Sequence, residues 1–109
     1  MKPFMKMGST VVVQANSTAP QGVRANANGN ALATRYRIFN PDANTAWVAY
    51  GETGPAAQAN AVIPLSGTPS GAQAVPTLEI VIIQGPPNCF WSAVCAAGNN
   101  NINVTPGDA

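Results

Sequence analysis

The chain has 109 residues, enough for one small domain. It contains no histidine, only five basic and four acidic residues, and a net charge of +1. General acid–base catalysis needs a positioned proton carrier, most often His or a carboxylate with a shifted pKa. Metal sites need clustered His, Cys, Asp or Glu side chains. Since neither set is present, we predict that the protein is not an enzyme and binds no metal or other cofactor.

The few charges are separated along the chain. The basic residues come first, at Lys2, Lys6, Arg24, Arg35 and Arg37. The acidic residues follow, at Asp42, Glu52, Glu79 and Asp108. This separation favours head-to-tail association between copies or binding to a charged host surface. Nucleic acid is not an expected partner, because a phosphate-binding surface needs several clustered cations. Charged residues make up 8% of the chain, and so low a content protects only weakly against association.

No membrane partner is expected either, because no run reaches the roughly 18 apolar residues of a spanning helix. Near the N-terminus, the apolar run at 11–13 is too short for a signal peptide. We therefore expect the protein to stay in the cytoplasm where it is made. Large apolar side chains are scarce and alanine is abundant, which predicts a thin core whose burial is completed by a partner surface.

Short apolar stretches separated by Gly and Pro continue through the chain, without a sustained 3.6-residue period. Residues 1–9 are predicted to be an extended N-terminal arm, and residues 10–109 one domain. The first strand is expected at 10–15, followed by a long loop at 16–30. The clearest strand is 32–39, which places Tyr36 and Ile38 on one face and Arg35 and Arg37 on the other.

A turn is predicted at 40–44, where Pro fixes φ and Asn and Asp side chains cap the local backbone. Residues 45–50 are expected to return beside 32–39 as a hairpin. Two further segments are rich in small residues and are predicted to be loops, at 52–60 and 66–74. The remaining predicted strands are 61–65, 77–83, 89–96 and 102–105, with a terminal tail at 106–109. The strand at 77–83 shows little alternation, so both its faces are expected to be covered.

Seven short strands without a helix predict an all-β fold, a small antiparallel β-sandwich or barrel-like domain. Cys89 and Cys95 lie on one predicted strand, which separates them by roughly 20 Å. A disulfide needs Cα atoms within about 7 Å. We therefore predict two partly buried thiols and no bridge.

Arg35 and Arg37 share one strand face and are candidates for a basic stripe that contacts an acidic partner. The alternative, which we favour, is cross-strand pairing with Glu79 or Glu52. The arm, with Lys2, Phe4, Lys6 and three Met, is either a frayed end or a segment that docks on a neighbour through adaptable contacts.

The aromatic residues Trp47, Tyr50 and Trp91 are candidates for a binding site, although core packing is the favoured role. Phe90 and Trp91 are adjacent and point to opposite faces of one strand. A thin domain has one core, so we expect one of these two side chains to pack against another chain.

Several segments carry a resemblance to a known class: RYRIFN at 35–40, AWVAYG at 46–51, VIPL at 62–65, FWSAV at 90–94 and VTPGD at 104–108. The chain resembles, over most of residues 10–108, the small β-rich capsid decoration or cement proteins of tailed bacteriophages. The resemblance implies a structural virion protein on the outer capsid surface that bridges capsomers and has no catalytic residue. It implies the major capsid protein and further copies of the chain, as a dimer or trimer, as partners.

On this hypothesis the contacts to the capsid or to another copy come from the arm, the basic stripe and the apolar pair: Lys2, Phe4, Lys6, Arg35, Arg37, Phe90 and Trp91. A second hypothesis is a tail- or fibre-associated β-domain that binds another virion protein or a host glycan. In that case Trp47, Tyr50 or Trp91 would contact the sugar.

Overall fold

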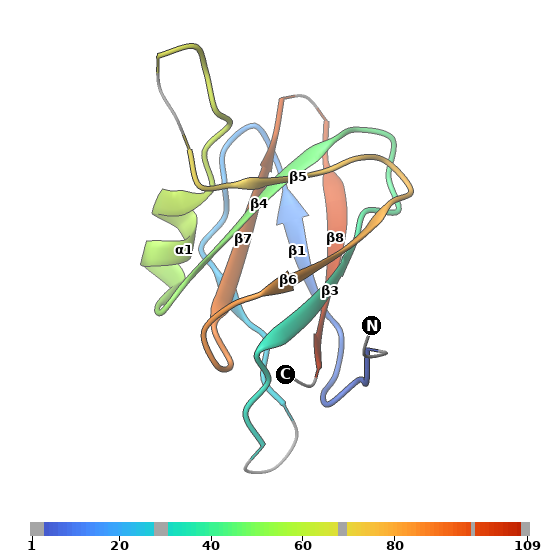
Figure 1. Cartoon of the computed structure of the whole chain (residues 1–109). Coiled ribbons are helices and arrows are strands. Elements are labelled where there is room, and N and C mark those ends of the chain that lie inside the picture. Colours follow the sequence, from blue (N-terminus) through green and yellow to red (C-terminus); the bar gives the residue numbers. More distant parts are fainter. Residues whose placement is uncertain (1–3, 28–30, 68–69, 97, 108–109) are drawn as a thin grey trace.

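The computed structural model describes residues 4–27, 31–67, 70–96 and 98–107. Within these ranges the chain forms eight strands in two four-stranded antiparallel sheets, with one short helix (Figure 1). The predicted all-β sandwich is therefore confirmed, with one strand more than expected and a helix that was not expected.

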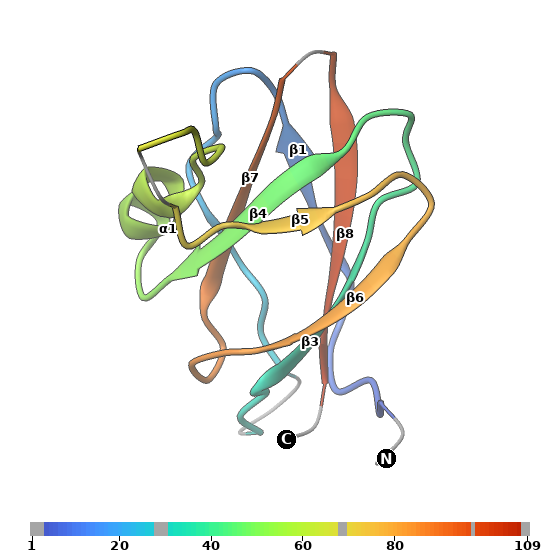
Figure 2. The same cartoon turned by 45° about the horizontal axis from the view of Figure 1, so that its top comes forward.

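The two sheets are built from alternating parts of the chain. Sheet A has the order β1 (Val11–Ala15), β8 (Asn100–Gly107), β3 (Arg35–Phe39) and β6 (Ile80–Gln84). Sheet B has the order β2 (Val23–Arg24), β7 (Phe90–Cys95), β4 (Ala46–Gly51) and β5 (Gln73–Val75). The helix α1 (Gly54–Asn60) packs against β4 and β7 of sheet B (Figure 2).

Strand pairing follows a simple rule. Each strand in the first half of the chain pairs with the strand at the same distance from the other end: β1 with β8, β2 with β7, β3 with β6 and β4 with β5. The chain is thus one long antiparallel hairpin that is rolled up, and the rolling brings β3 beside β8 and β4 beside β7. This strand order defines a jelly roll.

The predicted hairpin between 32–39 and 45–50 is wrong. β3 lies in sheet A and β4 in sheet B, and the connection at 40–44 crosses between the sheets. The predicted turn chemistry is nevertheless present: the buried Asn40 side chain donates to the carbonyl oxygens of Asn44 at 2.7 Å and Val75 at 2.9 Å. Because β8 and β6 occupy both edges of β3, the returning strand has no free edge of β3 to pair with.

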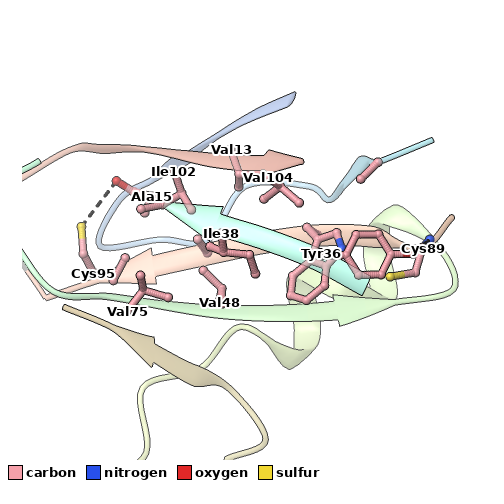
Figure 3. Packing of buried hydrophobic residues seen from close by; sticks show 14 residues of the cluster. Val13, Ala15, Tyr36, Ile38, Val48, Val75, Cys89, Cys95, Ile102 and Val104 are labelled. Atoms are coloured by element: carbon pink, nitrogen blue, oxygen red, sulfur yellow. Dashed lines mark hydrogen bonds between the residues drawn. The ribbon is translucent and has the colours of Figure 1, made fainter. Parts of the chain in front are cut away.

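The core lies between the two sheets and contains a few large side chains among many small ones (Figure 3). Tyr36, Ile38 and Trp91 are its largest members, and the Tyr36 and Trp91 rings lie 5.1 Å apart. Figure 3 shows Cys89 and Cys95 at opposite ends of this core. Both are buried thiols without a disulfide, as predicted.

On one side the two sheets are bonded to each other. The backbone N–H of Cys95 in β7 donates to the Asn16 oxygen at 2.9 Å, directly after β1 ends. The thiol of Cys95 also donates to the Ala15 oxygen at 3.4 Å (Figure 3). These contacts give this side of the sandwich a barrel-like closure.

Other element predictions need correction. Residues 54–60 form α1 instead of a loop: Thr53 caps it by accepting from the Ala56 N–H at 3.2 Å, and Pro55 stands in its first turn. Two turns are too short to show helical periodicity. The chain at 61–65 forms no named strand, whereas β2 lies within the loop predicted at 16–30 and β5 begins within the loop predicted at 66–74. Residues 106–107 extend β8 instead of starting a tail.

The expectation that 77–83 is covered on both faces is also wrong. β6 begins only at Ile80 and lies at the edge of sheet A. Ile80 and Ile82 point away from the core and are 47% and 45% exposed. The apolar run at 80–83 therefore belongs to an edge strand whose outer face is half exposed. The lack of alternation did not indicate burial of both faces.

Candidate functional site

The described part of the N-terminal arm lies against the end of β8. The Met7 N–H donates to the Pro106 oxygen at 2.9 Å, and Lys6 forms a β-bridge with Gly107. Gly8 is packed so closely that a Cβ atom there would lie 2.2 Å from the Asn26 oxygen. Residues 4–8 are therefore packed on their own domain. Lys2, the other basic residue predicted for the arm, lies outside the described residues.

Phe4 covers the outer face of sheet A at Gly107. A Cβ atom on Gly107 would lie 2.3 Å from Phe4 Cζ, so the ring occupies the space that a side chain at Gly107 would fill. Arg35 stands opposite Gly107 in the β3–β8 register, and its guanidinium carbon lies 5.9 Å from the centre of the Phe4 ring. This is cation–π geometry. Two residues predicted separately as interface residues are thus brought together.

Arg37 follows on the same outer face of β3 and is exposed. Its cross-strand neighbours are Ile82 on β6 and Thr105 on β8. The neighbours of Arg35 are Gln84 and Gly107. Neither of the acidic partners considered from the sequence lies directly opposite these arginines.

An apolar strip continues from the two arginines along the same face. Phe39 is partly buried and lies opposite Ile80, which is followed by Ile82 on β6. We call the six residues of this continuous surface the outer patch: Phe4, Arg35, Arg37, Phe39, Ile80 and Ile82. It combines cations with exposed apolar side chains on one sheet face.

For Trp91 the favoured role in core packing is confirmed, and its assignment to an interface is wrong. Its side chain is 1% exposed and contacts the rings of Tyr36 and Tyr50, at 5.1 and 5.4 Å between centroids. Phe90 points to the other side of β7 and is partly buried, with the Arg24 guanidinium 5.8 Å from its ring centre. The two aromatic residues thus pack on opposite sides of β7 with partners from their own chain.

A pocket of about 380 Å³ lies where β4 and β5 of sheet B approach β6 of sheet A. Val48, Ile83 and Trp91 provide apolar lining, while Asn60 and Gln73 contribute amide groups. Tyr50 is 40% exposed here, and its carbonyl oxygen accepts from the Asn60 side chain at 3.0 Å. Among the described residues the indole N–H of the buried Trp91 finds no hydrogen-bond partner. None of the described lining residues carries a charge.

Potential nucleophiles are kept protonated by burial. Desolvation raises the pKa of Tyr36 and of Cys89 above their ordinary values. The Tyr36 hydroxyl donates to the Pro86 oxygen at 2.6 Å and accepts from the Cys89 N–H at 3.1 Å, which orders this end of the core. Neutral thiol and phenol groups in such surroundings are structural.

Nowhere in the described chain do three His, Cys, Asp or Glu side chains gather into a possible metal site. None of its described helices has the length and apolar character needed to cross a membrane. Comparisons with protein-family models, curated proteins and solved structures found no significant match to the chain.

Several residues of these two surfaces were missed from the sequence. Ile80 and Ile82 belong to an apolar run in which every residue has core character, so their outward direction follows only from the β3–β6 register. Asn60 and Gln73 lie in segments predicted as loops. Of the pocket residues, Tyr50 and Trp91 carried a usable signal, because exposed or adjacent aromatic residues are typical of binding surfaces.

Proposed function

We propose that the protein is a structural virion subunit that decorates or cements a bacteriophage capsid, and that the outer patch contacts the major capsid protein. The observation that carries this proposal is the outer patch itself. Arg35 and Arg37 lie beside the half-exposed Ile80 and Ile82 on one face of sheet A. Buried parts of protein interfaces are enriched in Arg and in apolar and aromatic side chains.

The arm contributes to this surface from within its own domain. Phe4 covers Gly107 and supports the guanidinium of Arg35, so the arm helps to shape the patch. Jelly rolls occur in capsid and lectin domains alike. Because one fold hosts many functions, the proposal depends on the patch and on the resemblance described above.

On a capsid lattice, a subunit can bind stably even when each of its contacts is weak. A subunit that bridges capsomers contacts more than one site at once, which increases overall avidity without strong binding at each site. Binding to the lattice also stabilises the folded subunit by mass action. The low content of charged residues, 8%, is compatible with a chain that works in close contact with neighbours.

The test is co-sedimentation with expanded, decoration-free capsids of the phage that encodes the chain. We expect wild-type protein to bind at a constant copy number per capsomer. Arg37→Glu should weaken binding about tenfold or more, because it reverses one charge in the patch. Arg24→Glu is the matched control, since Arg24 lies on sheet B beside Phe90, and it should bind like wild type. Absence of wild-type binding would exclude the proposal, as would equal binding by both variants.

A second function is favoured by the pocket, namely binding of a neutral glycan. The apolar face of a sugar ring packs well on aromatic side chains, and amides such as those of Asn60 and Gln73 pair with hydroxyl groups. Of the three aromatic residues suggested by the sequence, Tyr50 and Trp91 line the pocket. Trp47 alternates with Val48 and lies on the other face of β4.

A glycan array distinguishes this second function. Specific binding should be lost in Tyr50→Ala and in Gln73→Ala, and retained in Trp47→Ala. Trp91 is unsuitable for this test because its removal would leave a large core cavity. An array without a specific signal, or a signal that is lost only with Trp47, would reject the pocket as a glycan site.

A further inference from the structure

Most sheet edges in this jelly roll are short or covered. At the edges of sheet B, β2 has two residues and β5 has three. Beyond β5, the side chain of Asn60 donates to the Tyr50 oxygen and covers the edge of β4. At one edge of sheet A, β1 lies next to β2 and β7 and is bonded to Cys95 through Ala15 and Asn16. Such coverage prevents unwanted strand pairing.

The edge strand β6 differs from the others. It has five residues, Ile80–Gln84, and among the described strands it pairs with β3 alone, so its other edge has no strand partner. Natural edge strands are usually protected by Lys, Pro, a bulge or an inward-pointing charge. The strand IVIIQ contains none of these residues, and its register with β3 runs without interruption from Ile80 to Gln84. Its exposed face instead carries Ile80 and Ile82.

We propose that two copies of the chain pair through β6 in antiparallel orientation. A two-fold axis then joins the two A sheets into one continuous eight-stranded sheet. The partner is a second copy because the edge is complementary to itself. The inference goes beyond capsid binding and does not depend on it, although the pairing also places two outer patches on one continuous face.

The alternation of β6 requires the two-fold axis to pass through a residue, and an axis at Ile82, the middle of the strand, pairs all five residues of β6. Residues opposite each other in an antiparallel sheet point to the same face, and Ile80, Ile82 and Gln84 all point outward. With the axis at Ile82, this residue faces its own copy, Val81 faces Ile83, and Ile80 faces Gln84. Apolar side chains thus meet on both faces of the new sheet.

Charge supports the same register. With the axis at Ile82, Glu79 lies opposite Gly85 of the other copy, and the two Glu79 residues stand at opposite ends of the ladder, roughly 20 Å apart. An axis at Val81 would place Glu79 opposite Ile83 and desolvate a carboxylate without a partner. The two Arg37 residues remain separated by both β6 strands, about 14 Å, which exceeds the Debye length of about 8 Å at physiological salt.

The first test is sedimentation velocity of the full chain, without capsids, over a wide concentration range. We expect a monomer–dimer equilibrium. Ile82→Lys should raise the dimer dissociation constant about tenfold or more, while the fold tolerates it because this side chain is already 45% exposed. Val12→Lys is the matched control: Val12 is 53% exposed on the other edge strand of sheet A, and the variant should still dimerise. A wild-type chain that stays monomeric, or a dimer unaffected by Ile82→Lys, would overturn the proposal.

Cross-linking tests the register directly. A residue on the two-fold axis faces its own copy at a Cα separation of about 5 Å, which is within disulfide range. Ile82→Cys should therefore form a covalent dimer on oxidation, and Val12→Cys should not. The native thiols do not interfere because Cys89 and Cys95 are buried. Cross-linking of Val12→Cys in place of Ile82→Cys would show that the copies use another edge. Since dimerisation is measured without capsids, its failure and a failure of capsid binding are distinguishable.

Discussion

The ring of Phe4 occupies the place above Gly107 where a side chain on β8 would stand, with Phe4 Cζ only 2.3 Å from the position of a Cβ atom. This contact joins the two ends of the described chain, and the Phe4 ring also packs against the guanidinium of Arg35. It also explains why the last residue of β8 is a glycine, since a Cβ atom there would collide with the ring. The arm and the last strand thus form one unit of structure.

Gly107→Val should release the arm. The new side chain collides with the Phe4 ring, and overpacking of this kind costs typically about 1–3 kcal/mol. Hydrogen exchange of the Met7 amide, which donates to the Pro106 oxygen, should become faster. Gly71→Ala is the control, because a Cβ atom there meets open space. Unchanged protection of Met7 in the Gly107 variant would contradict this account of the arm.

Asn88 is expected to be one of the most sensitive polar positions. Its side-chain oxygen accepts from the Ala27 and Ala33 N–H groups at 3.1 and 3.0 Å, and its φ is +47°. Asn88→Ala loses these bonds and replaces Asn, which tolerates the left-handed region, with Ala, which does not, so we expect a loss of about 3 kcal/mol in the free energy of unfolding. Urea denaturation measures it. Asn88→Gly removes the bonds without backbone strain and should lose less; an equal loss would assign the whole effect to the hydrogen bonds.

Stability should fall at alkaline pH. Burial raises the pKa values of Cys89 and Tyr36 in the folded state, above ordinary values of 9.0 and 10.0. Above these ordinary values the unfolded chain loses protons that the folded chain retains, so the free energy of unfolding decreases as pH rises. Below about pH 8 both groups are protonated in the folded and in the unfolded chain, so their ionisation should not change the free energy of unfolding. Cys89→Ala should make the alkaline decrease less steep, because one of the buried groups that loses a proton on unfolding is removed. A decrease of the same steepness in both proteins would contradict the assignment to Cys89.

The two thiols should be unreactive in the folded protein. Cys89 and Cys95 are both buried in the core, and a thiol needs access and thiolate character to react. An aromatic disulfide reagent should therefore modify them slowly under native conditions and rapidly in denaturant, with both thiols titrating. Rapid modification of the native chain would show that one end of the core opens readily.

Much of the local structure could be predicted from the sequence. The alternation around Tyr36 and Ile38 identified β3 and its two faces correctly, and the spacing of Cys89 and Cys95 excluded a disulfide. The turn residues at 40–44 act as predicted. The partner of β3 was nevertheless wrong, because a turn describes where the chain reverses and not which strand it then joins.

The candidate site, too, could be predicted from the sequence only in part. Phe4 and Arg35 were each predicted as interface residues, but their contact depends on the β3–β8 register and on the return of the arm to Gly107. Trp91 was assigned to an interface because two adjacent aromatic residues exceeded the expected core. In the folded chain the two facing sheets enclose a core that accommodates Trp91, where Tyr36 and Tyr50 contact the indole ring.

Composition and alternation of residues alone were thus sufficient to establish an all-β domain and the faces of its clearest strand, since these properties depend on neighbours within a few positions. Pairing of the strands, the covered and uncovered sheet edges, and the assembly of the outer patch were settled by the folded chain. The physical reason is that in a jelly roll the first strand pairs with the last. Contacts between such distant segments depend on how the whole core packs, and no local pattern encodes them.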